Sequence, residues 1–325
     1  MVYDIVIIGG GVSGFAGAMY AGRLNLKTLI LADLPGGVIT TTDTVENYPG
    51  FIKLTGQELA DKIKEHAMQY DVDFVQERVT DVKKSSKCFT VSAGGKKYEG
   101  KTILFATGTK SKNLNIPGEE EFRNKGVHEC ALCDGAFYKD KVIAVIGGAD
   151  SSAKEALVLN QYAKKVYIIY RGDKIHPEPV NMKRIEASRK IEIITNTNVL
   201  EIKGDKKVRS VILDKEYKGK KGLDIDGIFV AIGHIPLSDL AKNIGVKLDK
   251  KGQIMIDRNS NTNVEGVYAA GDVGDTKFKQ AITGVAEAVL ASYSAYEYVN
   301  SHDLVCAVDD IEYSEKNRKK KKINV

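Results

Sequence analysis

Two cysteines three positions apart, in the run Cys130-Ala-Leu-Cys133, are the residues whose types and spacing point most directly to chemistry. A cysteine thiolate attacks disulfides, and a second cysteine at this spacing can resolve the mixed disulfide without large backbone motion. Asp134 follows at once, and a carboxylate there can deliver the proton that a leaving thiolate needs. The motif therefore predicts a pair that carries two electrons as a reversible disulfide.

A zinc site is the alternative interpretation, because Cys-x-x-Cys also supplies half of many zinc sites and His128 lies close by. Zinc needs a fourth ligand, and Cys88 and Cys306 are single and distant, with no paired spacing. In a reducing compartment four cysteines do not form a disulfide framework. We therefore expect a catalytic close pair, no bound metal, and ordinary thiols at Cys88 and Cys306.

Length and charge bound the function further. The chain has 325 residues, which favours two domains. It contains no apolar run near the length of a membrane span and no charged-then-apolar leader, so we expect a cytoplasmic protein without membrane contact. The formal net charge is +5, but six basic residues between Lys316 and Lys322 contribute +6. The remainder is close to −1, which argues against a nucleic-acid partner.

The elements that position this chemistry begin with a glycine-rich turn, Gly9-Gly-Gly11-Val-Ser-Gly14, between an apolar strand-like run and a helix-like stretch. Gly9 makes the tight turn, Gly11 lets the backbone approach a pyrophosphate at a helix N-terminus, and Gly14 permits close helix–strand packing. Asp33 stands about 20 residues further on, where a carboxylate accepts hydrogen bonds from a ribose diol. The full dinucleotide-binding fingerprint is therefore present.

A second turn, Gly147-Gly-Ala149-Asp-Ser-Ser152, is a damaged copy of the first. Ala149 replaces the glycine that admits the pyrophosphate, and Ser152 replaces the small apolar residue at the helix–strand contact. The next strand ends at Tyr170-Arg171, which offers no carboxylate to select NAD and a single arginine for a 2′-phosphate. The pattern predicts that the fold is kept, and it leaves the ligand open.

The rest of the chain reads as further strands and a long helix. Residues 87–93 alternate and predict a small antiparallel excursion, and residues 101–108 return the chain to the first sheet. Residues 227–233 and 266–273 have the form of buried strands, and a helix is expected over about 280–298. From about residue 301 the sequence is charged and poorly periodic, which predicts a largely disordered tail.

With two dinucleotide turns, Cys-Ala-Leu-Cys-Asp before the second and Tyr-Ala-Ala-Gly-Asp-Val near the end, the chain resembles the low-molecular-weight thioredoxin reductases over nearly its whole length. Further shared segments are Gly36-Gly37, Thr40-Thr41-Thr42 and residues 45–50, 106–108 and 280–283. The resemblance implies an α/β fold of two Rossmann-like dinucleotide-binding domains, the second inserted in the first. The FAD-binding domain would span residues 1–112 and 242–325, and a central domain, residues 113–241, would carry the dithiol. We also expect a homodimer.

The same resemblance implies roles for individual residues. Cys133 would face the flavin, Cys130 would attack the protein substrate, thioredoxin, and Asp134 would be the acid–base group. Thr41 and Asn47 would line the flavin, Asp272 would bind the ribityl–phosphate region, and Gln280 and Ala281 would lie at the isoalloxazine. The FAD-binding set would thus be Gly9, Gly11, Gly14, Asp33, Gly37, Thr41, Asn47, Asp272, Gln280 and Ala281.

The departures from this family concern the electron donor. Its NADPH site pairs an intact glycine turn with a His-Arg-Arg-x-x-x-Arg string, whereas this chain has Tyr170-Arg171-Gly172 and His176 at those positions. Each lost charged contact to phosphate forgoes about 1.5–3 kcal/mol. Similar reductases that lack the nucleotide motifs take electrons from ferredoxin. Electron transfer from a ferredoxin at about −400 mV to a thioredoxin at about −270 mV is downhill in free energy. We therefore expect reduced ferredoxin as the donor.

Several alternatives stay open. A thioredoxin reductase of this kind could bind NAD(P)H through Arg171, Lys174 and His176, or take electrons from a reduced deazaflavin. A ferredoxin–NADP reductase lacks a dithiol, so Cys130 and Cys133 argue against it; a peroxiredoxin-reducing oxidase usually adds an N-terminal dithiol domain, whereas this chain begins at its FAD turn. The non-enzymatic alternative is a flavin-bound thiol redox sensor, which turnover with thioredoxin would distinguish.

Overall fold

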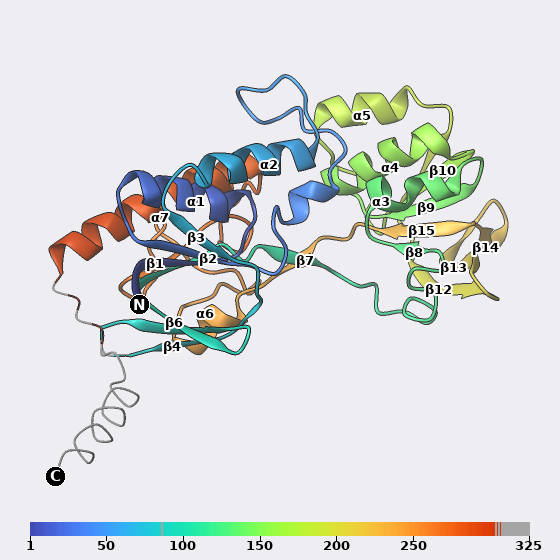
Figure 1. Ribbon diagram of the computed structural model, residues 1–325. Coiled ribbons are helices and arrows are strands. Elements are labelled where there is room, and N and C mark those ends of the chain that lie inside the picture. The colour runs from blue at the N-terminus through green and yellow to red at the C-terminus, as the bar shows by residue number, and fades with distance from the viewer. Residues whose placement is uncertain (86, 303, 305, 307–325) are drawn as a thin grey trace, which may run out of the picture. The chain divides into compact units, whose positions relative to one another are not determined.

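The computed structural model describes residues 1–85, 87–302, 304 and 306 (Figure 1). The chain divides into two compact units, the first made of residues 1–40, 46–108 and 236–325, the second of residues 41–45 and 109–235. These limits lie a few residues before the expected boundaries at 113 and 241. The predicted α/β class with two Rossmann-like units is confirmed, since each unit has its own sheet with parallel strands. The tail expected to be disordered lies largely outside the described residues.

The first unit is built on a sheet in the order β3-β2-β1-β6-β5-β4, with β17 also paired to β6. Strands β1, β2, β3, β6 and β17 pair in parallel, whereas β4, β5 and β6 form the antiparallel excursion that the sequence predicts. The carboxyl ends of the central parallel strands therefore meet at one edge of the sheet. The strands are β1 (Val2–Ile8), β2 (Thr28–Leu31), β3 (Val72–Val75), β4 (Val79–Lys84), β5 (Phe89–Ala93), β6 (Lys96–Phe105) and β17 (Val267–Ala269).

Helices α1 and α7 pack together against one face of this sheet (Figure 1). Gly17 has no side chain between them: a Cβ there would lie 3.3 Å from Oγ of Ser292 in α7 and 2.8 Å from Leu104 in β6. Ser292 of α7 donates a hydrogen bond of 2.8 Å to the Gly17 carbonyl. The helical segments of this unit are α1 (Val12–Arg23), α2 (Gly56–Ala67), α6 (Asp239–Asn243), α7 (Ala281–Ser301) and the 3-10 turn η1 (Val38–Thr41), which ends at the unit boundary.

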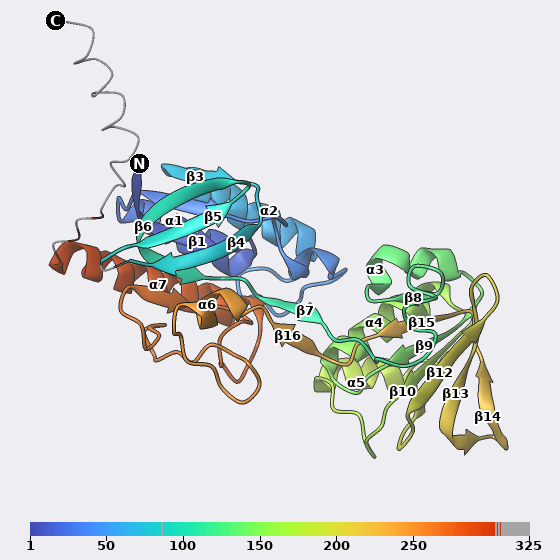
Figure 2. The ribbon, with the colours of Figure 1, turned by 90° about the horizontal axis from the view of Figure 1, so that it is seen from below.

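The second unit has a parallel sheet in the order β11-β10-β9-β15-β8 and an antiparallel sheet in the order β12-β13-β14 (Figure 2). Strands β7 and β16 pair where the chain enters and leaves this unit. The strands are β7 (Thr109–Ser111), β8 (Val127–His128), β9 (Val142–Ile146), β10 (Lys165–Ile169), β11 (Ile191–Ile194), β12 (Val199–Gly204), β13 (Val208–Tyr217), β14 (Lys220–Asp224), β15 (Gly227–Val230) and β16 (His234–Pro236). The helical segments are α3 (Ala131–Asp134), η2 (Gly135–Tyr138), α4 (Asp150–Tyr162) and α5 (Pro179–Glu186).

A disulfide between Cys88 and Cys306 corrects the sequence analysis, which expected two ordinary thiols. The two cysteines are 218 positions apart, and their Cα atoms lie 5.5 Å apart. Cys88 is buried directly before β5, so it is held by the core of the first unit. The pairing was missed because it depends on how the chain returns to this strand, which spacing does not encode.

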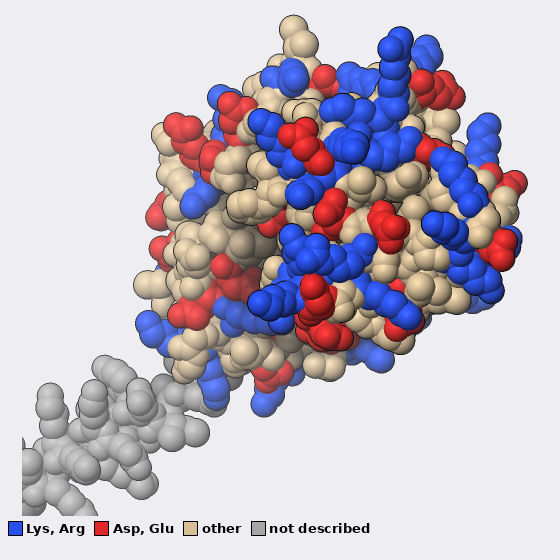
Figure 3. All heavy atoms as spheres, turned by 90° about the vertical axis from the view of Figure 1, so that its right-hand side faces the viewer, with Lys and Arg blue, Asp and Glu red and all other residues tan. Residues whose placement is uncertain are grey.

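The surface and the helices bear on possible partners. No helix in the described part of the chain is long and apolar enough to cross a membrane. Figure 3 shows Lys and Arg side chains interspersed with Asp and Glu. Exposed pairs such as Arg209–Asp205 belong to the second unit. Mixed charge of this kind differs from the single-sign basic stripe typical of nucleic-acid binding.

Candidate active site

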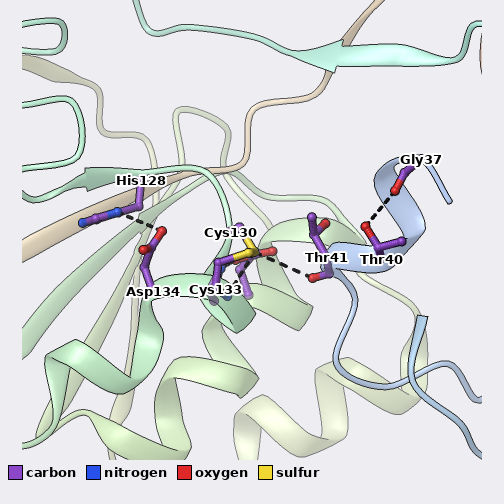
Figure 4. Close-up of a disulfide and its surroundings, with 9 residues drawn as sticks. Gly37, Thr40, Thr41, His128, Cys130, Cys133 and Asp134 are labelled. Carbon is purple, nitrogen blue, oxygen red and sulfur yellow. Dashed lines mark hydrogen bonds and ion pairs between the residues drawn. A yellow bond between two sulfur atoms is a disulfide. The ribbon is translucent and has the colours of Figure 1, made fainter. Parts of the chain in front are cut away.

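The dithiol lies at the start of the short helix α3, where Cys130 and Cys133 form a disulfide (Figure 4). Cys130 is the N-cap residue, and its Sγ accepts a hydrogen bond of 3.1 Å from the main-chain N–H of Cys133. Main-chain N–H groups at a helix start have no intrahelical partner and stabilise negative charge. After reduction, this arrangement favours the thiolate form of Cys130.

Asp134 ends the same helix and faces a buried histidine (Figure 4). Its Oδ2 lies 3.0 Å from Nδ1 of His128, whose side chain is 8% exposed. From the sequence, His128 was of interest only as a possible zinc ligand. In the part of the chain that is described, no group of three or more His, Cys, Asp and Glu is arranged to hold a metal, and Cys130 and Cys133 are bonded to each other. The structure therefore gives His128 a carboxylate as its neighbour.

Glu155 is a site residue that the sequence analysis missed. It lies on α4 and accepts a hydrogen bond from the main-chain N–H of Ala131, the first residue of α3. Burial raises the pKa of Glu155 to about 7, and the hydrogen bond from Ala131 opposes this effect. No motif marks this glutamate, because its contact arises from the packing of α4 against α3.

The first glycine turn has the form that a dinucleotide needs. Gly9 has φ +114°, and a Cβ there would lie 2.2 Å from the Ala106 carbonyl oxygen. A Cβ on Gly14 would lie 1.9 Å from the carbonyl oxygen of Gly9. Gly11 is different, because a Cβ there would reach only the backbone of Gly37 and its neighbour, at 3.9 Å or more. The N-terminus of α1 has no side-chain cap and no acid in its first turn. Its free N–H groups and the open approach at Gly11 fit a pyrophosphate.

The other residues expected to bind FAD are placed as follows. Asp33 and Asp272 are exposed just beyond the carboxyl ends of β2 and β17. Gln280 is the N-cap residue of α7, directly before Ala281, and its Oε1 accepts a hydrogen bond of 2.9 Å from Asn47. All of these lie in the first unit, as do the glycine turn and Gly37. Thr41 instead belongs to the second unit, where its carbonyl oxygen lies 4.0 Å from Sγ of Cys130 (Figure 4).

The second glycine turn keeps the shape of the first. Gly147 has φ +145°, and a Cβ there would lie 2.3 Å from the Ala231 carbonyl oxygen, as at Gly9. The main-chain N–H of His176 donates a hydrogen bond of 2.7 Å to the Gly148 carbonyl, just as that of Gly36 donates one of 2.7 Å to the Gly10 carbonyl in the first turn. The ring of Tyr170 lies against Gly148, where a Cβ would be 2.5 Å from it. The segment after β10 is therefore fastened to its turn in the same way as in the first unit.

Asp150 supplies a negative charge at this turn. It is the first residue of α4, and its carboxylate accepts hydrogen bonds from the main-chain N–H of Glu178 at 2.9 Å and from Nδ2 of Asn181 at 2.8 Å. Nζ of Lys154 lies 2.9 Å from its other oxygen. Although burial opposes it, these contacts lower the pKa of Asp150. An ionised carboxylate thus lies at the helix N-terminus, the position at which this fold binds a pyrophosphate.

Comparison with known proteins agrees with this arrangement. The family model of the pyridine nucleotide-disulphide oxidoreductases matches residues 3–288. The thioredoxin reductase of Mycolicibacterium smegmatis is 38% identical over 93% of this chain and 98% of its own, and the NADPH-dependent thioredoxin reductase 3 of Arabidopsis thaliana is 35% identical over 94% of this chain and 60% of its own. The crystal structure of Lactococcus lactis thioredoxin reductase superposes with a TM-score of 0.89 at 36% identity, covering 92% of this chain and all of that one. A ferredoxin-flavin thioredoxin reductase from Clostridium acetobutylicum gives a TM-score of 0.50 at 29% identity, covering 93% and 99%.

Proposed function

Since the chain belongs to the pyridine nucleotide-disulphide oxidoreductase family, within its low-molecular-weight thioredoxin reductases, we propose that it reduces thioredoxin with electrons that originate from reduced ferredoxin. The enzyme is a flavin-dependent disulfide oxidoreductase, and its cofactor is FAD. When bound, FAD supplies a two-electron reductant for the Cys130–Cys133 disulfide. The name of the Mycolicibacterium relative supports thioredoxin as the protein substrate.

The first unit would hold the cofactor. The open backbone at Gly11 and the uncapped start of α1 would bind the pyrophosphate, and Asp33 would accept hydrogen bonds from the ribose. Asp272 would bind the ribityl–phosphate region. Gln280, fixed by its hydrogen bond to Asn47, would lie at the flavin ring. The proposal follows from the fit of these residues to a dinucleotide.

Within the dithiol, we assign the attack on thioredoxin to Cys130 and the contact with the flavin to Cys133. The hydrogen bond from the Cys133 N–H to Cys130 Sγ supports this assignment, because it stabilises the nucleophilic thiolate at Cys130. Asp134 would serve as the acid–base group that protonates the departing sulfur. Substituting either cysteine by serine separates the roles. Cys133→Ser should stop electron flow from reduced flavin, whereas Cys130→Ser should leave a thiolate that gives a long-wavelength charge-transfer band with the flavin.

The carboxylate at the second turn is the single observation that carries the ferredoxin proposal. Asp150 occupies the N-terminus of α4, whereas the first turn of α1 has no acid. A nucleotide would have to place its phosphates beside this negative charge. An electron-transfer protein needs neither a phosphate site nor a ribose site, so the loss of both is compatible with a ferredoxin donor.

A second candidate is an NAD(P)H-dependent thioredoxin reductase. The Arabidopsis relative carries NADPH dependence in its name, and its 35% identity exceeds the 29% of the Clostridium ferredoxin-flavin thioredoxin reductase. In that case the nucleotide would bind at the second turn despite the carboxylate of Asp150. Lys174 and Arg171 would supply the charge for its phosphates.

Anaerobic stopped-flow bleaching of the flavin in the FAD-loaded protein tests the donor. We expect fast bleaching with reduced ferredoxin and none with NADPH or NADH at millimolar concentration. Prompt bleaching with micromolar NADPH would establish the second candidate. Bleaching with a reduced deazaflavin but not with ferredoxin would replace the donor and keep the enzyme.

We further propose a cytoplasmic homodimer, following the sequence expectations. The absence of a suitable spanning helix among the described residues is compatible with this location. Light scattering coupled to size exclusion measures the assembly directly, and a monomer across the working concentration range would refute the dimer.

A further inference from the structure

His128 is the candidate residue that neither the sequence motifs nor the proposed electron route uses. It ends the edge strand β8, two residues before Cys130, and is 9% exposed. Its ring stacks on Phe229 with centroids 5.2 Å apart and meets the edge of Tyr138 at 5.4 Å. Two aromatic rings therefore fix the orientation of the imidazole, so its nitrogens point in defined directions.

The two nitrogens face two different partners. Nε2 lies 2.7 Å from the hydroxyl of Tyr138, and Nδ1 lies 3.0 Å from Oδ2 of Asp134 (Figure 4). Burial, with the charges of Asp134 and Asp226, raises the pKa of Tyr138 to about 12. The phenol therefore keeps its proton at neutral pH and can donate it to Nε2. A neutral imidazole then carries its own hydrogen on Nδ1, toward the carboxylate.

The contact between His128 and Asp134 is close but not aligned. Although Nδ1 lies 3.0 Å from the carboxylate oxygen, the contact is not a regular hydrogen bond, and Nδ1 has no other partner among the residues that the structure describes. The Asp134 side chain is 31% exposed, so it has room to rotate. A small rotation either completes the hydrogen bond to the fixed ring or turns the carboxylate away from it.

We propose that His128 is the positioning residue of Asp134, which directly follows Cys133: His128 orients that carboxylate through Nδ1 while Tyr138 holds the imidazole through Nε2. The inference rests on the proposed function, because it gives Asp134 the acid–base role. It reverses the usual triad, in which a carboxylate orients a histidine. Here the buried histidine orients the exposed carboxylate.

The chemistry balances without any further reactant. As a cysteine thiol becomes the nucleophile, its proton passes to Asp134; the new sulfur–sulfur bond forms while the thioredoxin disulfide breaks, and Asp134 returns the proton to the departing sulfur. Two electrons pass from the dithiol to thioredoxin over the two exchange steps. The Asp134–His128 pair ends with the protons it began with, so the proposal asks His128 only to orient the carboxylate.

A double-mutant cycle on the full FAD-loaded chain tests the proposal. His128→Phe keeps a ring for the stack on Phe229 and removes both nitrogens, whereas His128→Asn keeps an N–H donor near Nδ1. We expect His128→Phe to lower kcat with a purified oxidised thioredoxin by about 10- to 100-fold. KM should stay within about twofold and flavin reduction by the donor should not change. His128→Asn should retain most of the rate.

The cycle is completed in an Asp134→Asn background, where His128→Phe should cost nothing more. An equal loss in that background would show a merely structural histidine and overturn the proposal. A His128→Asn variant as slow as the His128→Phe variant would also overturn it. Should His128→Phe fail to fold, Tyr138→Phe removes the other anchor and should give a smaller loss that also depends on Asp134. A loss with Tyr138→Phe that is the same in the Asp134→Asn background would overturn it.

Alkylation of the reduced dithiol by iodoacetamide separates this proposal from the proposed function. If native protein fails to reduce thioredoxin, the proposed function fails. The inference still stands if His128→Phe changes the alkylation rate only when Asp134 is present. An alkylation rate that His128→Phe leaves unchanged, both with native Asp134 and in the Asp134→Asn background, would overturn the inference.

Discussion

Glu155 accepts a hydrogen bond from the main-chain N–H of Ala131, which places a largely buried carboxylate at the start of the helix that carries Cys133. Sγ of Cys130 accepts a hydrogen bond from the main-chain N–H of Cys133 in the same helix. The two acceptors satisfy different N–H groups of α3, so the geometry of the dithiol depends on α4. This relationship leads to the first prediction.

We predict that Glu155→Gln stabilises the protein more at about pH 8 than at about pH 5. The pKa of Glu155 is raised from 4.5 to about 7 in the folded protein, mainly by burial. The stability that this group contributes is therefore full below pH 4.5 and is lost as the pH rises through about 7. Glutamine does not titrate, so the free energy of unfolding of the variant should rise relative to that of the native protein by up to about 3 kcal/mol as the pH increases through this range. Denaturant unfolding at the two pH values measures the difference.

Glu192→Gln is the control for the Glu155 experiment. Hydrogen bonds from Lys165, Tyr217 and Lys218 lower the pKa of Glu192 to about 2. Its contribution is present above the ordinary pKa and lost only as the pH falls toward about 2, so its substitution should have the same effect at both test values. A Glu155 variant that behaves in the same way would show that its carboxyl does not titrate near neutrality.

The second prediction concerns the second nucleotide turn. The triple substitution Asp150→Asn, Tyr170→Ala and Gly172→Arg removes the internal negative charge, makes room for a side chain at position 172 and adds one phosphate contact. One charged contact is worth about 1.5–3 kcal/mol, so NADPH affinity should rise by at least about 10-fold, measured by calorimetry. Gly172→Arg alone should gain little, because a Cβ at Gly172 would lie 2.5 Å from the Tyr170 ring. Equal affinity in the single and triple variants would contradict the roles given to Asp150 and Tyr170.

The third prediction is that Gly11→Val loses FAD and keeps the fold. A Cβ at Gly11 would meet nothing closer than 3.9 Å, and the residue has φ −78°, so the protein itself tolerates a side chain there. The valine would instead fill the space that a pyrophosphate needs. Flavin absorbance per chain should fall severalfold at least, with an unchanged circular dichroism spectrum. Gly222→Val is the matched control, since a Cβ there meets nothing within 4 Å; a Gly11 variant as yellow as this control would refute the site.

The fourth prediction is that Cys306→Ser destabilises the first unit only when the protein is oxidised. The Cys88–Cys306 disulfide closes a loop of 218 positions, and the chain-entropy model gives about 5 kcal/mol for a loop of that length. The thermal midpoint of the variant should lie several degrees below that of the native protein, and reductant should bring the two together. Cys130→Ser serves as the control, because its disulfide spans 3 positions and constrains the unfolded chain little. Free thiols at Cys88 and Cys306 in the oxidised native protein would contradict this pairing.

The sequence by itself determined the parts of this protein that depend on local pattern. The fingerprint at Gly9, Gly11 and Gly14 predicted the first dinucleotide turn, because steric demands at a turn act between neighbours in the chain. The close spacing of Cys130 and Cys133 likewise indicated a disulfide without knowledge of the fold. The antiparallel excursion around β5 followed from residue alternation. These features need only a few consecutive residues to specify them.

The tertiary structure decided what depends on contacts between distant segments. Cys88 pairs with Cys306 across 218 positions, and Glu155 reaches Ala131 from the next helix. The damaged second turn looked merely weak in the sequence, whereas the fold brings Glu178 and Asn181 onto the carboxylate of Asp150 at its helix start. Chain returns and packing bring these groups together, and neither leaves a period or a spacing in the sequence.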